Sequence, residues 1–487
     1  MLFNSYIFVL LFLPLCLIGY FALNHFRQYQ LGQIFLLLMS LWFYGYFTPV
    51  YLPIILGSIV INYGFSYVLL TNKHQSVRRG IFVAAVLINL GVLFYYKYFN
   101  FFMENVNVLF GTGFTARHIL LPLGISFFTF QQLSYIIDSY RKEVPVYDFI
   151  QYACFVAYFP QLIAGPIVTH DELVPQFVDK EKKHFSWANL SKGILIFVLG
   201  MAKKVLIADT MGNAANWGFA NIGQLNSTNA LLSMIAYTIQ IYFDFSGYCD
   251  MAIGIGKMMN IDLPLNFNSP YKAKNIAQFW TRWHMTLTRF FRKYLYIPLG
   301  GNRKGKLFTY VNVMIIYLVS GLWHGANWTF VLWGMLHGVA SVLYRQFKKT
   351  VDRIPTVITW AMTFVFINVT WVFFRADSIN DACTLIGSIG QCNFGPIAAE
   401  LLAAFSLPEL TFVLNLVPGI SILQVFPALL LILFVAVSLI IALFFNNAYE
   451  KMVNFRAEPL GMISIAVLAV WCVLSFAGVS TFLYFNF

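Results

Sequence analysis

The chain has 487 residues, of which 60% are hydrophobic and only 10% are charged, and its formal net charge is +12. Soluble globular domains carry roughly 25% charged residues, so this composition excludes a soluble protein and indicates an integral membrane protein. Its six cysteines are scattered with no C-x-x-C spacing, and we expect most of them to be small buried apolar residues. Only Cys383 and Cys392 could pair, if their loop faces an oxidising space.

Apolar runs recur along the whole chain, and each is about long enough to cross the ~30 Å hydrocarbon core of a bilayer. We therefore predict an all-α, polytopic transmembrane protein with roughly ten to twelve spanning helices in a single domain over residues 1–487. The first run has neither a basic region before it nor a cleavage site after it, so we expect it to remain as a helix. The predicted spans are residues 5–23, 31–47, 51–70, 80–103, 149–168, 188–208, 229–259, 308–347, 356–374, 424–445 and 460–478.

Lysine and arginine mark the loops that we expect on the cytoplasmic side, where membrane proteins carry an excess of both. The clusters do not alternate cleanly with the spans because Lys203 and Lys204 interrupt the count, so we predict re-entrant or interfacial segments. Asp138 lies near Arg141, and we interpret it as one half of an ion pair at a helix end. The basic clusters are Lys73/Arg78/Arg79, Arg141/Lys142, Lys180/Lys182/Lys183, residues 272–306 and Arg345/Lys348/Lys349/Arg353.

Two further carboxylates, Asp244 and Asp250, interrupt an apolar run together with Ser246. Charged groups at such positions imply partners or an aqueous cavity. A spacing of six residues separates the two by about 240° on a helix, so they do not form a paired acid and base unless Gly247 breaks the helix. Structural roles, such as bonding to Arg282 or to free backbone donors, explain them as well as catalysis does.

Residues 266–306 contain nine lysines and arginines and no acidic residue. Apolar and aromatic residues recur at helical spacing over residues 276–294 and fill one arc of about 120°, with basic residues opposite. We predict an amphipathic helix at the cytoplasmic interface, which ends before Pro298. A surface anchor to anionic membrane lipid is as compatible with this pattern as a functional site. His284, at the edge of the apolar arc, is a candidate site residue.

His324 lies within a run apolar enough to span the membrane, where an ionisable side chain is costly and usually faces a bundle interior or cavity. Imidazole is also the side chain best suited to move protons near neutral pH. Gly321 and Gly325 remove side-chain bulk around it, so another backbone or a substrate can approach. Trp323 is adjacent, and Asn327 would lie on the same helical face and could orient the imidazole. We favour function over a core histidine bonded to a backbone carbonyl.

His337 follows His324 by about 220° of rotation and ~20 Å of rise on a continuous helix, so it should face elsewhere unless Gly334 breaks the helix. Residues 375–423 combine loop residues with prolines and are expected to form a cap of short interfacial helices. We expect no metal site, because the histidines lack metal-ligand spacing. The chain also has neither a glycine-rich phosphate loop nor the serine-nucleophile motif G-x-S-x-G.

Seven motifs in order carry a resemblance. They are residues 121–127 (LPLGISF), 159–167 (FPQLIAGPI), 243–248 (FDFSGY), 265–271 (LNFNSPY), 279–284 (FWTRWH), 296–303 (YIPLGGNR) and 321–325 (GLWHG), followed by the terminal residues 481–487. Together they resemble the membrane-bound O-acyltransferase family, in particular its bacterial branch typified by the membrane subunit of alginate O-acetylation. One departure is Arg292-Lys293, where many relatives carry Arg-Asp, so no role of that acid is transferred.

The resemblance implies an O-acyltransferase with His324 as the catalytic residue and His284 as a second functional histidine. It implies a ring of helices around a central tunnel, in a bacterial inner membrane. A cytoplasmic thioester, most simply acetyl-CoA, would be the donor substrate, with no permanently bound cofactor. An extracytoplasmic polysaccharide would be the acceptor, reached directly or through a partner protein resembling SGNH hydrolases, and we expect no nucleic-acid partner.

The residues are compatible with this chemistry. The basic face of residues 272–306 could attract the phosphates of a CoA thioester. Neutral His324 could take a proton from the attacking hydroxyl, or position the thioester for a serine of the partner, and the sequence leaves both routes open. Asn327 or tryptophan indole N–H donors could stabilise the oxyanion. Asp244, Ser246 and Arg282 are expected to support the tunnel or position the substrate.

Three other interpretations remain at this point. An acyl carrier protein could be the donor, as in D-alanylation of teichoic acids. A proton-coupled transporter of polysaccharide or lipid-linked sugar would also explain intramembrane histidine and aspartate, although the internal repeats that transporters often show are not visible. A structural scaffold for an export complex would leave His324 and its glycines unexplained.

Overall fold

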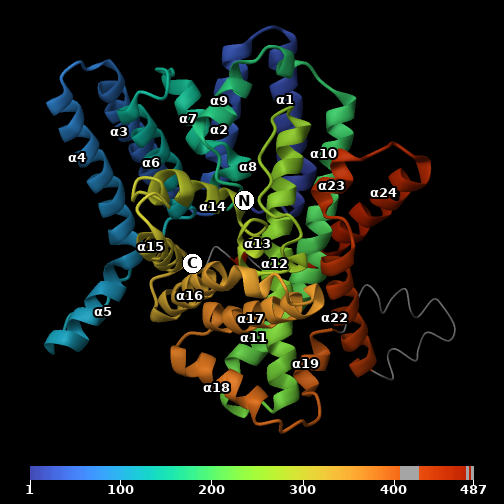
Figure 1. Ribbon diagram of the computed structural model, residues 1–487. Coiled ribbons are helices and arrows are strands. Elements are labelled where there is room, and N and C mark those ends of the chain that lie inside the picture. The colour runs from blue at the N-terminus through green and yellow to red at the C-terminus, as the bar shows by residue number, and fades with distance from the viewer. Residues whose placement is uncertain (406–426, 479–481, 484–487) are drawn as a thin grey trace. The chain divides into compact units, whose positions relative to one another are not determined.

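The computed structural model of the protein describes residues 1–405, 427–478 and 482–483, and every regular element in these ranges is helical (Figure 1). The predicted all-α class is therefore confirmed. Six helical stretches in these ranges are long and apolar enough to cross a membrane, and each overlaps a predicted span, although the predicted run 308–347 is divided at Gly325 into two helices. They are Phe8–His25, Pro49–Thr71, Gln75–Phe110, Lys306–His324, Thr356–Arg375 and Pro427–Phe444.

The chain divides into two compact units. Unit 1 comprises Met1–Phe197, Met251–Leu265 and Arg292–Tyr294, and unit 2 comprises Val198–Asp250, Asn266–Phe291 and Leu295–Phe487. Both units therefore draw on segments that are distant in sequence, and residues 266–306 are divided between them. This interleaving is compatible with the single domain predicted for the chain, because neither unit is a continuous stretch.

In unit 1, helix α6 forms the centre. It packs against α3 and α4, and nearly all of its side chains are buried. Leu69, Ala85 and Ile136 form the apolar contact between these three helices. The helices of this unit are α1 (Leu13–His25), α2 (Tyr29–Gly45), α3 (Leu52–Thr71), α4 (Gln75–Leu93), α5 (Phe99–Phe110), α6 (Ile125–Arg141), α7 (Phe149–Ala157), α8 (Phe159–Leu162), α9 (His170–Val178) and most of α10 (Trp187–Ala202).

Two of the sequence motifs meet at the start of α6. Gly124 caps this helix in the left-handed conformation, with φ of 70°, which glycine adopts without steric cost. A Cβ at this position would lie 2.8 Å from the carbonyl oxygen of Leu162 and 3.2 Å from Cα of Ile163. The turn of residues 121–127 therefore packs backbone to backbone against residues 159–167, which explains the glycine in the first motif.

Asp138, near the C-terminal end of α6, is the centre of a buried polar cluster. Its Oδ2 atom accepts hydrogen bonds from Lys293 Nζ at 2.9 Å and from the Tyr294 hydroxyl at 2.7 Å. His170 Nε2 lies 3.3 Å from the same oxygen, and the Tyr147 hydroxyl lies 3.1 Å from His170 Nδ1. The expected pairing of Asp138 with Arg141 is wrong, because α6 turns the carboxylate inward, where Lys293 supplies the positive charge.

This cluster makes stability depend on pH. Burial alone would raise the pKa of Asp138, but the bonds from His170, Lys293 and Tyr294 outweigh it and hold that pKa below its usual value of 3.8. The ionised carboxylate therefore stabilises the fold above pH 3.8, and this contribution is lost as the pH falls through the lowered pKa of the folded state. At neutral pH, we expect Asp138→Asn to lower the free energy of unfolding by about 2–3 kcal/mol.

Thermal unfolding in detergent, at neutral pH and below pH 3.8, measures this effect. The difference in unfolding temperature between Asp138→Asn and the unsubstituted protein should be smaller in acid. Asp171→Asn removes a neighbouring but exposed carboxylate and serves as the control. An equal difference in unfolding temperature at both pH values would contradict the ionic role of Asp138.

In unit 2, helices α15 and α16 form an antiparallel hairpin (Figure 1), and α17 packs on α16. Apart from the end of α10, its helices are α11 (Asp209–Ala220), the part of α12 (Ser227–Met258) up to Asp250, α13 (Ile276–Trp280), α14 (Met285–Phe291), α15 (Lys306–His324), α16 (Trp328–Val351), α17 (Thr356–Arg375), α18 (Ile379–Gly390), α19 (Ala399–Ala403), α22 (Pro427–Phe444), α23 (Ala448–Val453) and α24 (Pro459–Leu474). Short helices α18 and α19 lie within the predicted cap of residues 375–423, whose residues 406–423 are outside the described ranges.

The hairpin of α15 and α16 depends on glycine. A Cβ on Gly321 would overlap the carbonyl oxygen of Phe330 and lie 3.4 Å from Cα of Gly334. The prediction that Gly321 lets another backbone approach is therefore confirmed. We expect Gly321→Ala to destabilise the protein by about 1–3 kcal/mol, because the added methyl group must push two packed backbones apart.

Thermal unfolding of the purified protein measures the effect of Gly321→Ala. The control is Gly387→Ala in α18, where a Cβ meets no atom within 4 Å. That change should be neutral or stabilise by up to about 1 kcal/mol, because alanine favours a helix interior over glycine. Equal stability of the two variants would show that α15 and α16 do not depend on this close approach.

Most of the cysteines are buried, as expected for small apolar residues. The two exposed cysteines are not disulfide-bonded. Cys16, Cys154, Cys249 and Cys472 are buried, whereas Cys383 and Cys392 are exposed free thiols. The structure therefore contains no bond between the two cysteines considered as a pair.

Candidate functional site

The predicted amphipathic helix over residues 276–294 is wrong, because the chain breaks within it. It forms α13, then a turn, then α14, and then a π-helical turn at Arg292–Tyr296. Asn275 caps α13 by accepting a hydrogen bond from the Gln278 N–H at 2.8 Å. The aromatic side chains of the predicted apolar arc up to Phe291 are buried inside unit 2, with Phe279 and Trp283 each 1% exposed. The apolar side of this segment therefore packs into the protein interior instead of forming a surface anchor, while basic residues such as Lys274 and Arg289 are exposed.

His284 is the last residue of the turn between α13 and α14. Its φ is 44°, in the left-handed region that residues other than glycine rarely adopt. Its side chain is fully buried, and Nδ1 lies 3.1 Å from Oδ1 of Asn266. Burial lowers the pKa of His284, which lies outside the six apolar spans, to about 3. The imidazole is therefore neutral throughout the physiological pH range, as a proton acceptor must be.

His324 is the last residue of α15, and its side chain is only 3% exposed. The rings of His284 and His324 have centroids 6.5 Å apart. The structure thus brings together the two histidines that the sequence nominated, although 40 residues separate them (284 to 324). They lie close enough for both to contact one small reacting group.

Aromatic rings enclose the two imidazoles. Trp323 lies edge to face with His324 at 4.9 Å, and Trp333 and Phe374 contact the same ring at 5.2 and 5.1 Å. Phe245 lies edge to face with His284 at 4.9 Å. We call these two histidines and their four aromatic neighbours the histidine pocket. Exclusion of water by these rings strengthens every electrostatic interaction inside it.

Asn327 does not lie beside His324 on one helix, so the predicted orienting role is wrong. Helix α15 ends at His324 and Gly325, and Asn327 begins the next helix as its cap. Its Oδ1 accepts from the Thr329 N–H at 3.0 Å, and its Nδ2 donates to the Asp377 carbonyl at 2.9 Å. The periodicity argument failed because it assumed an unbroken helix through Gly325.

His337 is not a partner of His324, as predicted, although the helix break lies at Gly325 rather than at Gly334. Its Nε2 lies 3.1 Å from the Thr370 hydroxyl, and the Trp280 indole donates to its Nδ1 at 3.3 Å. The ring of Trp333 contacts both histidines, at 4.7 Å from His337. Both ring nitrogens of His337 therefore have hydrogen-bond partners within the core.

The carboxylates of α12 form buried ion pairs. Lys204 Nζ lies 2.6 Å from Asp244 Oδ1 and 2.7 Å from Asp209 Oδ1, and Lys203 Nζ lies 2.5 Å from Asp250 Oδ2. Helix α12 continues through residue 247, so the two aspartates remain apart, as their spacing predicted. The lysines that disturbed the predicted topology are thus internal counter-charges rather than loop markers.

The other expected supporting residues have different surroundings. Ser246 is buried, and its hydroxyl lies 3.5 Å from Lys203 Nζ. Arg282 does not bond Asp244 but donates to the Asn268 carbonyl at 3.1 Å. The second oxygen of Asp244 accepts from the Leu483 N–H at 2.9 Å, which ties the described part of the terminal motif to α12. Most of that motif, residues 479–481 and 484–487, lies outside the described ranges.

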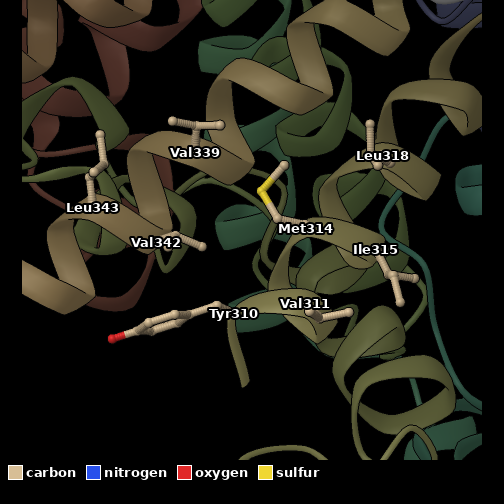
Figure 2. Close-up of a pocket in the computed structure, with 8 residues that line it drawn as sticks. All are labelled: Tyr310, Val311, Met314, Ile315, Leu318, Val339, Val342 and Leu343. Atoms are coloured by element: carbon tan, nitrogen blue, oxygen red, sulfur yellow. The ribbon is translucent and has the colours of Figure 1, made fainter. Parts of the chain in front are cut away.

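A separate cavity of about 300 Å³ lies along α15 and α16 (Figure 2). All eight lining residues come from these two helices, and only Tyr310 carries a polar side-chain atom, a hydroxyl that donates to Gln346 at 2.6 Å. The lining residues are Tyr310, Val311, Met314, Ile315, Leu318, Val339, Val342 and Leu343. Its lining contains no histidine or carboxylate, so we assign no proton transfer to this groove.

Sequence reasoning missed residues that surround the histidines. Asn266 appeared only as a motif letter, because a single asparagine in a loop produces no periodic signal. Trp333 was not singled out either. In the structure its buried indole N–H has no hydrogen-bond partner among the described residues. A detectable signal existed for Lys203 and Lys204, since two basic residues in one apolar run can balance acidic residues in another.

Comparison with known proteins identifies the family of the chain. The model of the MBOAT, membrane-bound O-acyltransferase family, matches residues 124–380, which include both histidines. The chain is 41% identical over 438 residues to the peptidoglycan O-acetyltransferase of Helicobacter pylori, covering 82% of this chain and 83% of that protein. It is 40% identical over 390 residues to the probable alginate O-acetylase AlgI of Pseudomonas aeruginosa, covering 78% and 73%.

A more distant relative is the teichoic acid D-alanyltransferase of Bacillus subtilis, which is 26% identical over 276 residues and covers 52% of this chain and 68% of that protein. These relatives are all acyltransferases by name, which overturns the transporter and scaffold interpretations. The chain belongs to the membrane-bound O-acyltransferase family and is a multi-pass membrane O-acyltransferase.

Proposed function

We propose that the protein takes an acetyl group from a cytoplasmic thioester and passes it across the bacterial inner membrane for O-acetylation of an extracytoplasmic polysaccharide. The observation that carries this proposal is the pairing of His284 and His324, 6.5 Å apart in the buried histidine pocket. Two imidazoles at this separation can contact both the acceptor oxygen and the leaving sulfur of one reacting group. Both Lys204 and Lys203 are occupied by carboxylates, which leaves the histidines as the natural proton carriers of the site.

The chemistry needs one base and one oxyanion donor. The acceptor O–H attacks the thioester carbonyl carbon, a C–O bond forms, and an imidazole takes the hydroxyl proton. When the tetrahedral intermediate collapses, the C–S bond breaks and the same proton goes to the departing thiolate. The indole N–H of Trp333, whose ring contacts His324 at 5.2 Å, is a suitable donor to the oxyanion.

The relatives support an acetyl group and a polysaccharide acceptor. The two relatives near 40% identity are named for O-acetylation of peptidoglycan and of alginate, and each aligns over more than three quarters of this chain. The D-alanyltransferase aligns over only 52% of it. We therefore place acetyl transfer ahead of D-alanyl transfer from an acyl carrier protein.

Acetyl-CoA is the donor that fits the charge of residues 272–306. Several basic residues of this segment are exposed, among them Lys274, Arg289 and Arg303, and can attract the phosphates of CoA. The final acceptor is reached either directly or through a partner resembling SGNH hydrolases, whose serine would receive the acetyl group. In the second route, the histidines act on the partner's hydroxyl instead of the polymer's.

Reconstitution tests this function. The purified protein in liposomes receives radiolabelled acetyl-CoA outside, with polysaccharide fragments, and with or without the candidate partner, enclosed in the lumen. We expect label on the enclosed polymer, and label on the partner if the two-step route operates. Transfer from an acetylated or D-alanylated carrier protein, but not from acetyl-CoA, would contradict the proposed donor. No transfer from any thioester donor by a folded protein would overturn the proposal.

A further inference from the structure

Asn266 is the polar residue that holds His284. It is fully buried in the loop before α13, and its Oδ1 lies 3.1 Å from His284 Nδ1. The same oxygen accepts from the Thr286 backbone N–H at 3.2 Å and from the Thr286 hydroxyl at 2.8 Å. Its Nδ2 donates to Cys249 Sγ at 3.3 Å. Every polar atom of this side chain therefore has a defined partner.

These contacts determine which amide atom faces the histidine. A backbone N–H can only donate, so the atom that Thr286 N contacts must be an oxygen. The orientation of the Asn266 amide is thereby fixed by the backbone of α14, with no need to assume the state of the histidine. The atom beside His284 Nδ1 is an acceptor, and Nδ1 must carry a hydrogen to bond to it.

We propose that Asn266 is a positioning residue that fixes neutral His284 as the Nδ1–H tautomer and so leaves the lone pair on Nε2. That Nε2 atom is buried and has no hydrogen-bond partner among the residues the structure describes. It is thus free to accept the proton of an attacking hydroxyl. This inference rests on the proposed acyl transfer and deepens it, because it assigns the accepting atom within the histidine pocket.

The backbone around His284 supports the same role. The Asn266 carbonyl accepts from the Met285 N–H at 3.0 Å, and the Asn268 N–H donates to the Arg282 carbonyl at 2.9 Å. The loop of Asn266 is therefore bonded to both sides of the turn in which His284 adopts its left-handed conformation. Asn266 thus fixes both the location and the proton arrangement of this imidazole.

Two substitutions separate positioning from folding. Asn266→Ala removes the acceptor, so we expect kcat to fall about 10- to 100-fold with little change in KM, because the imidazole loses its fixed tautomer. Asn266→Asp keeps an acceptor beside Nδ1–H and adds negative charge, which stabilises protonated His284. The acid limb of its kcat profile should move to higher pH. The titratable groups placed around this imidazole are His324 and, through Asn266, the Cys249 thiol.

Asn268→Ala is the matched control, because Asn268 belongs to the same loop but its side-chain oxygen accepts from Asn447 Nδ2 at 3.1 Å. It should retain kcat and the pH profile. Nitrogen NMR of protein labelled with ¹⁵N-histidine reads the tautomer directly, and the His284 signal is identified by its loss in His284→Gln. The unsubstituted protein should show a protonated Nδ1 and an unprotonated Nε2.

An unprotonated Nδ1 in that spectrum would overturn the proposal. So would an Asn266→Ala variant whose kcat per folded molecule and pH profile are unchanged, since Asn266 would then only stabilise the fold. Failure of the proposed function is distinct from these results, because it would appear as absence of acyl transfer in the unsubstituted protein. The NMR signature remains measurable in that case.

Discussion

Replacing His324 with glutamine should reduce acetyl transfer by about 10²–10⁴-fold, the usual contribution of a general acid or base. Glutamine preserves much of the side-chain volume and can still form hydrogen bonds, but it cannot relay the proton that His284 accepts from the hydroxyl to the departing sulfur. His324 lies in contact with Trp323, Trp333 and Phe374, so the loss should appear in kcat while the protein remains folded. Initial rates in reconstituted liposomes and thermal unfolding of the same preparation measure both quantities.

The matched control for His324→Gln is His337→Gln, because His337 packs against the same Trp333 ring and bonds only to Trp280 and Thr370 among the described residues. It should cost stability but retain catalysis per folded molecule. Comparable loss of kcat in both variants would mean that disturbed aromatic packing, rather than loss of a proton carrier, explains the result. Full activity of His324→Gln would refute the assigned role.

Replacing Lys203 with methionine should destabilise the protein by about 3–5 kcal/mol, because it leaves the buried Asp250 carboxylate without its counter-charge. The side chain of Asp250 is 8% exposed, and its Oδ2 atom lies 2.5 Å from Lys203 Nζ. Much of the Lys203→Met protein should therefore fail to accumulate in the membrane. The amount of folded protein extracted in mild detergent and its thermal unfolding temperature provide the measurements.

The double variant Lys203→Met with Asp250→Asn tests the cause. With no charge left to compensate, most of the lost stability should return. If the double variant is as unstable as Lys203→Met, packing of the lysine stem rather than ion pairing accounts for the loss. Catalysis per folded molecule should persist in the double variant, since neither residue belongs to the histidine pocket.

The sequence was sufficient for the class of fold and for nominating His284 and His324, which the structure brings close together. Apolar runs long enough to span a bilayer predict helices whatever their partners, because unsatisfied backbone groups are costly in hydrocarbon. His324 was recognisable because an ionisable side chain is costly in such a run, and Gly321 correctly indicated a close backbone approach. These predictions depend on local composition, which the sequence displays directly.

Predictions that required a continuous helix failed. The helical arc over residues 276–294 had the right apolar residues, but hydrogen bonds from the loop of Asn266 hold the chain in a turn at His284. Asn327 was placed on the wrong helix for a related reason, since the chain turns at Gly325. Periodicity identifies which residues are buried, but long-range bonds to a loop decide where a helix ends, and these are not visible in the pattern.

Asp138 shows a further limit. Its carboxylate has an arginine three positions away, yet its cationic partner is Lys293, which lies 155 residues later in the chain. Nearest charge in sequence is a poor guide to pairing in a helical protein, where neighbours in space come from other helices. The same point explains why Lys203 and Lys204 disturbed the predicted topology instead of revealing their aspartates.

The buried ion pairs also have a consequence for how the protein is made. Lys203 leaves the ribosome 47 residues before Asp250, so the segment with this lysine is complete while its α12 partner is still missing, whereas Lys204 already has Asp209 in the same segment. An unpaired lysine or aspartate at the centre of a lipid-exposed helix costs about 2.5–3.5 kcal/mol each. Release of either helix alone into lipid is therefore unfavourable. The two helices should leave the insertion machinery as a pair, with the charges already matched.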